Sequence, residues 1–442
     1  MKDHVVTRFA PSPTGRAHAG SYRTAMYAWL FARKHAGTFI LRIEDTDLAR
    51  NDKESELDIY EALSWLGLDY DKKYIQSENL PRHQELLHKL IAEDKAYVSR
   101  EEAKDGSGVM KDIIRFRNPN RLVVFHDLVR GDIATDTTDL GDFVIARNMN
   151  EPLYHLAATI DDHDEGVTHV IRAEEHIANT PRQILIIEAL GWELPQYAHI
   201  PIVLGPDKQK LSKRKGALPM TEYAKRGYLQ EAVFNAIAMI GWNPADPGSE
   251  QELFSVAELV SRFDFERVQK SSAVFNEEKL NWFNREYVKK LPLGAFIDYA
   301  KQFLGSVSLP DDVLISIAPL LQERISYFAE LPDLIQKDFA FLLAKPVLDS
   351  SLIPWKESSP EQTKEYLTQV AELFRTISGW DDAMIRAALA PILESVGKGP
   401  ILWPLRYGLT GQKTSPDPFT CANLLGQGET IARIEQAIAA LS

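Results

Sequence analysis

Short apolar runs and helical stripes alternate at the start of the chain and predict a β–α–β unit. The run Val5–Phe9 predicts a strand, and the helical spacing that follows ends at Gly37. A second strand is predicted at Phe39–Ile43. The loop Ala10–Gly20 carries prolines and glycines, which break regular structure and let the backbone approach a ligand closely. Because ligands of β–α–β units bind at the carboxyl ends of strands and at helix N-termini, this loop is a candidate site.

The pattern then predicts helices on either side of a strand-rich segment. Glu54–Leu66 predicts a helix, and Ser77 is a candidate cap for the next one. Alternating apolar positions predict strands between Ile113 and Ala146. A short apolar run at Pro201–Leu204 predicts a further strand of the sheet.

Between these strands, Pro152–Asn179 alternates and predicts strands on both sides of an acidic turn at Asp161–Glu165. Thr180 is predicted to cap the helix that follows, with Pro181 in its first turn. Strand and helix together predict a βα unit that resumes the parallel sheet.

Helical spacing dominates after Thr221. Ser359 and Gln362 form a capping-box signature at the start of one predicted helix. A second stripe is interrupted by Pro391, which we expect to kink or divide that helix. The pattern therefore predicts an α/β part followed by an all-α part.

Composition limits the possible classes of protein. With 442 residues, the chain is too long for one core and predicts roughly three domains. The single cysteine, Cys421, excludes a disulfide framework and a cysteine-based zinc cluster, and favours a cytoplasmic protein. The first residues carry no apolar segment and no run approaches 18 apolar residues, so we expect neither secretion nor a membrane span. The net charge of −13 argues against a nucleic-acid partner, although binding to a polyanion requires only a local basic patch.

Two loops have residues suited to phosphate. His18 and Gly20 lie where the first loop enters its helix, so a phosphate there would meet backbone N–H groups and an imidazole. Lys210, Lys213 and Lys215 lie in a second loop, where fixed positive charge would stabilise a leaving pyrophosphate. The alternatives are an ordinary helix start with an exposed histidine and a solvated charged face.

Three charged residues at strand ends suit an amino acid with two carboxylates. Arg8 and Arg172 each lie at the end of an apolar strand, and Glu44 follows a third. Arginine binds carboxylates with two parallel hydrogen bonds, and Glu44 would complement an ammonium group. The alternative is that these three residues form salt bridges with one another.

Several motifs in order resemble one family. PSPTGRAHAG (Pro11–Gly20) resembles the HIGH signature of class I aminoacyl-tRNA synthetases in the form used by bacterial glutamyl-tRNA synthetases, and KLSKR (Lys210–Arg214) resembles their KMSKS signature. Other similar stretches lie between and beyond them: RIEDTD (Arg42–Asp47), DLVRGDI (Asp127–Ile133), DDHDEGVTHVIRAEEHIANTPRQ (Asp161–Gln183), LNWFNREY (Leu280–Tyr287) and LWPLRYGLTG (Leu402–Gly411).

The resemblance implies roles for individual residues. It assigns ATP binding to His18, Gly20, Glu175, His176, Lys210 and Lys213. Four of these would be catalytic: His18, Gly20, Lys210 and Lys213. It assigns L-glutamate to Arg8, Ser12, Glu44, Tyr154 and Arg172. ATP would be a substrate bound with Mg²⁺, and no protein metal site is expected. A guanidinium paired to the substrate carboxylate would reject glutamine, whose amide leaves the charge unpaired.

The chain also departs from the family pattern. Ala19 changes packing in the HIGH element, and Ser21 replaces its second imidazole. Many bacterial relatives carry a Cys/His zinc site in the inserted subdomain. The corresponding segment here is a short Gly/Ser stretch near Gly106 without cysteine, so we predict no structural zinc. The shortening also affects how the insertion would hold the tRNA acceptor end.

The resemblance implies a Rossmann-type catalytic domain with a β-rich insertion, followed by all-α domains. The expected segments are 1–81 and 170–220 for the catalytic domain, 82–169 for the acceptor-end insertion, 221–290 for stem contact and 291–442 for the anticodon. The implied activity is ATP-dependent formation of glutamyl-adenylate and transfer to tRNA-Glu, with activation requiring bound tRNA. We expect a cytoplasmic monomer that does not bind a membrane.

Three alternatives differ in testable ways. A glutaminyl-tRNA synthetase would be expected to end in β-barrels, whereas the pattern after Pro360 is helical. A short tRNA-modifying paralogue would lack the C-terminal third. A catalytically inactive tRNA-binding protein would not need His18, Gly20, Lys210 and Lys213. The sequence leaves open whether tRNA-Gln is charged as well.

Overall fold

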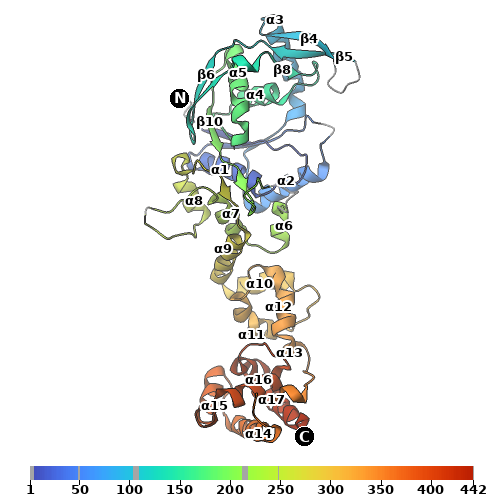
Figure 1. The fold of residues 1–442 in the computed structure, drawn as a ribbon, viewed down its shortest axis with the longest axis vertical. Helices are drawn as coiled ribbons and strands as arrows, with labels where there is room; N and C mark the ends of the chain where they lie inside the picture. Colours follow the sequence, from blue (N-terminus) through green and yellow to red (C-terminus); the bar gives the residue numbers. More distant parts are fainter. Residues whose placement is uncertain (1–3, 48–49, 103–108, 212–217, 247, 442) are drawn as a thin grey trace. The chain divides into compact units, whose positions relative to one another are not determined.

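The computed structural model describes residues 4–47, 50–102, 109–211, 218–246 and 248–441. The chain forms two compact units, Met1–Asn284 and Arg285–Ser442. The boundary falls inside helix α9 (Glu277–Lys290). Figure 1 shows strands and helices together in the first unit and helices in the second. This confirms the predicted α/β part followed by an all-α part.

The first unit is built on a seven-stranded sheet in the order β3-β2-β1-β9-β10-β6-β7. Neighbouring strands are parallel except for β6 and β7, which form an antiparallel pair. The strands are β1 (Val6–Phe9), β2 (Thr38–Ile43), β3 (Lys72–Ile75), β6 (Leu122–Asp127), β7 (Gly131–Asp136), β9 (His169–Ala173) and β10 (Gln196–Ile200).

The strand order reverses at β1, because β2 and β3 lie on one side of β1 and β9 and β10 lie on its other side. Thr7 pairs with Phe39 on β2 and with His169 on β9. In open α/β sheets, the crevice outside the carboxyl ends of strands at such a point is where ligands bind. The β–α–β start predicted from the sequence therefore lies at the centre of the sheet.

The strand-rich segment predicted between Ile113 and Ala146 is divided between two sheets. Strands β4 (Ala96–Glu102), β5 (Met110–Phe116) and β8 (Phe143–Ala146) form an antiparallel sheet of their own. Strands β6 and β7 instead extend the main sheet, where Tyr197 of β10 pairs with Asp127. Part of the inserted sequence thus supports the central sheet directly. The Gly/Ser stretch near Gly106 lies outside the described residues.

Helices cover the main sheet of the first unit. Helix α1 contacts β1, β2 and β9 on one side and the helices α7 and α8 on the other. The helices of this unit are α1 (Ala19–Lys34), α2 (Lys53–Leu66), α3 (Leu80–Ala92), α4 (Tyr154–Asp164), α5 (Thr180–Ala189), α6 (Met220–Lys225), α7 (Gln230–Ala238) and α8 (Val256–Arg262), followed by the start of α9.

The strand–turn–strand prediction for Pro152–Asn179 is wrong in its first part. Tyr154–Asp164 is the helix α4, and only β9 is a strand. Leu156 and Ile160, one turn apart, are buried as expected for a helix. The periodicity was obscured because Asp161 and Asp162 are also buried, so carboxylates occupy positions where apolar residues are expected.

Two predicted helix caps are also wrong. The Ser77 hydroxyl donates to Asp45, and α3 begins only at Leu80. The Thr180 hydroxyl is engaged by Arg172, and Asn179 occupies the cap position without a side-chain bond. In both cases the hydroxyl bonds a side chain from another part of the chain and does not cap a helix N–H group.

The strand predicted at Pro201–Leu204 does not join the main sheet. β11 (Val203–Leu204) pairs with β12 (Ala273–Val274) in a two-stranded ladder, which also interrupts the helical pattern expected after Thr221. The strand of the main sheet in this region is β10.

The second unit is helical and contains the remainder of α9. Its other helices are α10 (Leu293–Phe303), α11 (Asp311–Gln322), α12 (Leu331–Asp338), α13 (Ala340–Leu343), α14 (Pro360–Thr376), α15 (Asp382–Val396), α16 (Lys398–Thr410) and α17 (Pro418–Ala440). The capping box of Ser359 and Gln362 is confirmed at the start of α14. Pro391 lies inside the single helix α15 and does not divide it. In the described part of the chain, every helix is too short or too polar to cross a bilayer.

Candidate functional site

A cavity of about 500 Å³ opens at the carboxyl ends of β1, β2, β9 and β10. Its wall includes the first loop, which leads from β1 into α1, and the segment after β9. All predicted site residues that the structure describes line it: Arg8, Ser12, His18, Gly20, Glu44, Tyr154, Arg172, Glu175, His176 and Lys210. Lys213 lies outside the described residues. Residues predicted separately from three parts of the sequence therefore share one cavity.

Arg172 is a buried cation whose hydrogen-bond partners are neutral. Its Nη1 donates to Gln183 Oε1 at 2.7 Å, and its Nη2 donates to Thr180 Oγ1 at 2.8 Å. Its Nε donates to His199 Nε2 at 3.0 Å. The nearest carboxylate along this chain of contacts is that of Asp127, which bonds the opposite ring nitrogen of His199 at 2.6 Å. Among the described residues, no carboxylate pairs directly with Arg172.

Arg8 differs because its charge is already paired. Its Nε donates to Asp162 Oδ1 at 3.0 Å, and its Nη1 donates to the carbonyl of Ile171 at 3.2 Å. Although burial favours the neutral acid, Arg8 and Arg42 hold the pKa of Asp162 below its ordinary value. Of the two arginines predicted to bind carboxylates, only Arg172 lacks a protein carboxylate.

Glu44 directly follows β2, is buried and accepts a hydrogen bond from Arg42 of that strand. Arg42 Nη2 donates to Glu44 Oε1 at 3.2 Å. Burial raises the pKa of Glu44, while Arg42 and Arg8 act to lower it. A bound ammonium group would favour the ionised carboxylate in the same way. The alternative, salt bridges among Arg8, Arg172 and Glu44, is wrong, since Asp162 is the partner of Arg8 and Arg42 is the partner of Glu44.

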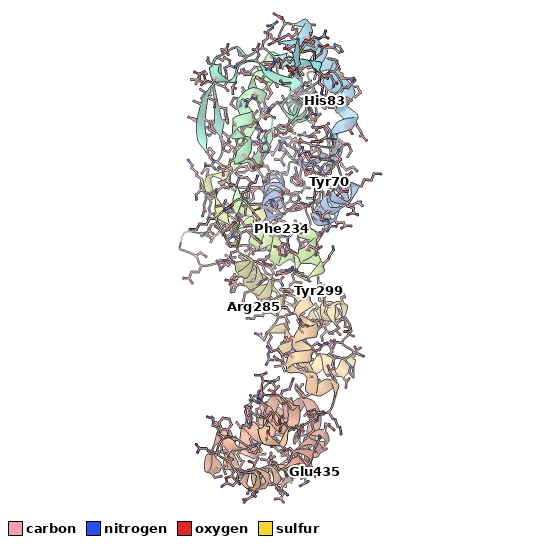
Figure 2. All side chains as sticks on the ribbon, turned by 45° about the vertical axis from the view of Figure 1, so that its right-hand side comes forward. Tyr70, His83, Phe234, Arg285, Tyr299 and Glu435 are labelled. Carbon is pink, nitrogen blue, oxygen red and sulfur yellow. The ribbon has the colours of Figure 1, made fainter. Side chains whose placement is uncertain are left out.

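Behind these residues lies a buried cluster of charges. Arg42 Nη1 contacts Asp162 Oδ1 at 2.9 Å and Glu165 Oε2 at 2.8 Å. Burial raises the pKa of Glu165 to about 8, against the lowering effect of Arg42. Asp161 contacts His83 of α3 at 2.7 Å; His83 is labelled in Figure 2. Contacts from α4 and α3 thus hold in place the charges that lie behind the cavity-lining residues.

The first loop meets α1 at His18. His18 is the N-cap of α1, and its Nδ1 accepts the Gly20 N–H at 3.1 Å. A Cβ on residue 20 would lie 3.1 Å from the imidazole ring, so glycine lets the ring pack over the start of the helix. The sequence prediction that His18 and Gly20 share a helix N-terminus is confirmed.

Helix α4 contributes a hydroxyl to the cavity, and the segment after β9 contributes an imidazole and an ion pair. The Tyr154 hydroxyl lies 3.2 Å from His176 Nδ1 and 3.3 Å from Arg172 Nη1. Burial, and next the charge of Arg172, lowers the pKa of His176 to about 4, although Glu175 opposes this shift. Lys210 forms an ion pair with Glu175, so the second loop already reaches this segment.

Sequence reasoning missed the residues that hold the predicted ones in place. Asp162, Thr180, Gln183 and His199 bond Arg8 or Arg172 directly. The acidic run Asp161–Glu165 was visible but was assigned to a turn. The spacing of four between Asp161 and Glu165 places both on one helix face, and this could have identified them as partners of a buried arginine, which is Arg42.

The arrangement suits a small zwitterion beside a polyanion. The buried cation Arg172, the buried carboxylate Glu44 and the paired Arg8 lie at the inner end of the cavity. Imidazole groups, Lys210 and the N–H groups at the start of α1 lie toward the first and second loops. Among the described residues, no group of three or more His, Cys, Asp or Glu side chains is arranged to hold a metal ion. The absence of a structural zinc stays a prediction.

Two family profiles match the chain. The profile described as "tRNA synthetases class I (E and Q), catalytic domain" matches residues 4–107 and 99–282. The profile described as "Anticodon binding domain" matches residues 295–438.

Similar proteins of known name cover nearly the whole chain. A glutamate–tRNA ligase of Desulforamulus reducens is 36% identical over 98% of this chain and 99% of its own length. One from Aquifex aeolicus is 39% identical over 92% of this chain and 93% of its own. The crystal structure of a glutamate tRNA ligase from Elizabethkingia meningosepticum, in complex with its amino acid, superposes with a TM-score of 0.88. Its sequence identity is 31%, and the match covers 99% of this chain and all of the other.

Proposed function

This chain belongs to the class I tRNA synthetases for glutamate and glutamine, and from that premise we infer that it is a glutamate–tRNA ligase. It activates L-glutamate with ATP and transfers it to the 3′-terminal ribose of tRNA-Glu, releasing AMP and pyrophosphate. The observation that supports glutamate as the amino acid is Arg172, a buried guanidinium with only neutral direct partners in the wall of the cavity.

In this proposal Arg172 binds the side-chain carboxylate, and Glu44 binds the ammonium group. Ser12, Tyr154 and Arg8 complete the amino-acid subsite and direct the α-carboxylate toward ATP. An oxygen of that carboxylate forms a bond to the α-phosphorus, and the bond from this phosphorus to the bridging oxygen of pyrophosphate breaks. A terminal ribose hydroxyl then attacks the acyl carbon, and AMP leaves.

ATP is bound at the other end of the cavity. His18, Gly20, Glu175 and His176 contact it in this proposal, and Lys210 with Lys213 stabilises the leaving pyrophosphate. Mg²⁺ would be bound to the ATP phosphates as part of the substrate. Catalysis is mainly positioning and charge stabilisation, because the step needs no covalent intermediate with the protein.

We also propose roles for the segments. Residues 1–81 and 170–220 form the catalytic domain, 82–169 hold the acceptor end and 221–290 contact the stem. Residues 291–442 contact the anticodon, a role supported by the matching family profile. The protein would work in the cytoplasm as a monomer, where tRNA is charged for translation.

The test is ATP–pyrophosphate exchange with purified protein, glutamate and tRNA-Glu, followed by charging assays. We expect exchange that requires glutamate and tRNA and is absent with glutamine as the amino acid. Parallel charging of tRNA-Gln shows whether the enzyme discriminates between the two tRNAs. If the protein binds tRNA but supports no exchange, it is not a ligase.

A further inference from the structure

Arg16 is a cation of the first loop that lines the cavity but has no role in the proposal above. It precedes His18 by two positions, at the start of α1. Its side chain is 42% exposed, whereas Arg8 and Arg172 are almost fully buried. Arg16 therefore lies on the solvent-facing side of the cavity.

The ion pairs of Arg16 are long. Its Nε lies 3.8 Å from Asp58 Oδ1, and its Nη1 lies 3.9 Å from Glu222 Oε1. Both distances exceed the usual range of a charge-assisted hydrogen bond.

Each of these carboxylate oxygens has a closer partner. The Thr221 hydroxyl donates to Asp58 Oδ1 at 2.6 Å, and Lys225 Nζ donates to Glu222 Oε1 at 2.8 Å. A half-exposed guanidinium with such long ion pairs loses little interaction energy when it leaves them to bind another anion.

Arg16 and Lys210 are the exposed members of the cavity's Arg and Lys side chains among the described residues. Arg8, Arg23 and Arg172 line the same cavity but are buried and bonded to protein groups. Arg16 comes from the first loop and Lys210 from the second, so the two cations approach the cavity from different segments. A triphosphate between the loops would meet both.

We propose that Arg16 is a further catalytic residue of the activation step, and this rests on the proposed function. Its guanidinium leaves Asp58 and Glu222 and binds the β- and γ-phosphates of ATP. When the glutamate carboxylate bonds to the α-phosphorus, the electron pair of the breaking bond passes to pyrophosphate. Arg16 stabilises that charge together with Lys210.

A purely structural role is the rival explanation. Arg16 contacts α2 through Asp58 and α6 through Glu222, and His18 forms a backbone bridge with Pro219, just before α6. In that case Arg16 would hold the first loop against α6 without touching ATP. Loss of Glu222 would then have the same effect as loss of Arg16.

The experiment compares ligands with and without the outer phosphates. In pyrophosphate exchange, Arg16→Ala should raise the KM for ATP about tenfold and weaken inhibition by added pyrophosphate by a similar factor. Inhibition by AMP should not change, because AMP lacks the β- and γ-phosphates. Arg16→Lys should restore part of the loss, since it keeps the charge but not the planar guanidinium.

Two variants provide the controls. Glu222→Gln should leave the KM for ATP unchanged or lower it, because it removes a competitor for Arg16. Arg50→Ala is matched to Arg16→Ala: Arg50 also lies within residues 1–81 and has an exposed side chain with a carboxylate partner, Asp47, but it does not line the cavity. It should behave as the unmodified protein.

The proposal is overturned if Arg16→Ala weakens inhibition by AMP as much as inhibition by pyrophosphate. It is also overturned if Glu222→Gln has the same effect as Arg16→Ala. A third contradicting result would be that Arg16→Ala changes inhibition by neither AMP nor pyrophosphate. These outcomes are measured against exchange by the unmodified protein. A failure of that exchange would contradict the proposed ligase activity rather than the role of Arg16.

Discussion

The two ends of the cavity are built differently. At the inner end, Arg8, Glu44 and Arg172 are 4%, 8% and 5% exposed, and each is fixed by hydrogen bonds from neighbouring elements. At the outer end, the side chains of Arg16 and Lys210 are 42% and 54% exposed, and both pair with carboxylates.

The difference separates two ways to bind a charged ligand. Buried charges act at low dielectric and are already oriented, so they can distinguish a carboxylate from an amide. Each exposed cation binds an anion more weakly, but it can exchange one anion for another as a reaction proceeds. We infer that the inner end determines which amino acid is used, while the outer end follows the phosphates from ATP to pyrophosphate.

The largest expected effect comes from removing the buried unpaired cation. Arg172→Gln should lower kcat/KM for glutamate in pyrophosphate exchange by about a thousandfold, or about 4 kcal/mol. The reason is that the substrate carboxylate then enters a buried subsite without its counter-charge. The KM for ATP should change little.

Arg182→Gln is the matched control, because Arg182 lies on the nearby helix α5 but does not line the cavity. It should retain normal kinetics. If Arg172→Gln keeps the glutamate kinetics of the unmodified protein, the inner end does not bind the side-chain carboxylate through this residue.

Removing the carboxylate behind Arg8 tests the other inner arginine. Asp162→Asn should lower the free energy of unfolding of the first unit by about 3 kcal/mol, because Arg8 and Arg42 both lose a buried partner. Urea denaturation measures this change.

Asp164→Asn, on the same helix, removes an exposed pair with Arg82 and should cost less than about 1 kcal/mol. Equal losses for the two variants would mean that the buried network contributes no more than a surface ion pair.

At the outer end we expect a smaller effect on the chemical step. Lys210→Ala should reduce kcat of exchange about thirtyfold, or about 2 kcal/mol, and leave the KM for glutamate unchanged. Lys208→Gln, at an exposed position of the same segment that does not line the cavity, should have no effect. A larger change in glutamate KM than in kcat would contradict the division between the two ends.

The smallest expected effect concerns His176, which lies between the ends. Because burial and Arg172 lower its pKa from 6.5 to about 4, its ring should stay neutral through pH 6–8. The contribution of this neutral ring to stability is present above pH 6.5 and is lost as the pH falls toward 4. NMR titration of the ring should show no transition near 6.5, and Arg172→Gln should move the transition to higher pH. A ring that titrates near 6.5 would mean that neither burial nor Arg172 lowers its pKa.

The sequence identified residues that line the cavity better than it identified the residues that hold them in place. Strand-end residues such as Arg8, Glu44 and Arg172 were identifiable, because parallel strands bring their carboxyl ends together. Asp162 was not, because a buried carboxylate on α4 does not follow the hydrophobic pattern. Thr180 was assigned to a helix cap, since no local pattern indicates that Arg172 takes its hydroxyl.

Assignment of strands to sheets was limited for a similar reason. The apolar pattern predicted strands between Ile113 and Ala146 but could not show that β6 and β7 join the main sheet beyond β10. Pairing between strands far apart in sequence depends on tertiary contacts rather than on local periodicity.

The most direct measurement is a pair of crystal structures, one with glutamate and one with glutamate and a non-hydrolysable ATP analogue. The first should show the side-chain carboxylate on Arg172, whose bonds to Gln183 and Thr180 stay in place. The second should show Arg16 and Lys210 moved from their carboxylate partners onto the phosphates. A glutamate side chain bound away from Arg172, or phosphates bound while Arg16 and Lys210 keep their present partners, would contradict the division between a fixed inner end and an adaptable outer end.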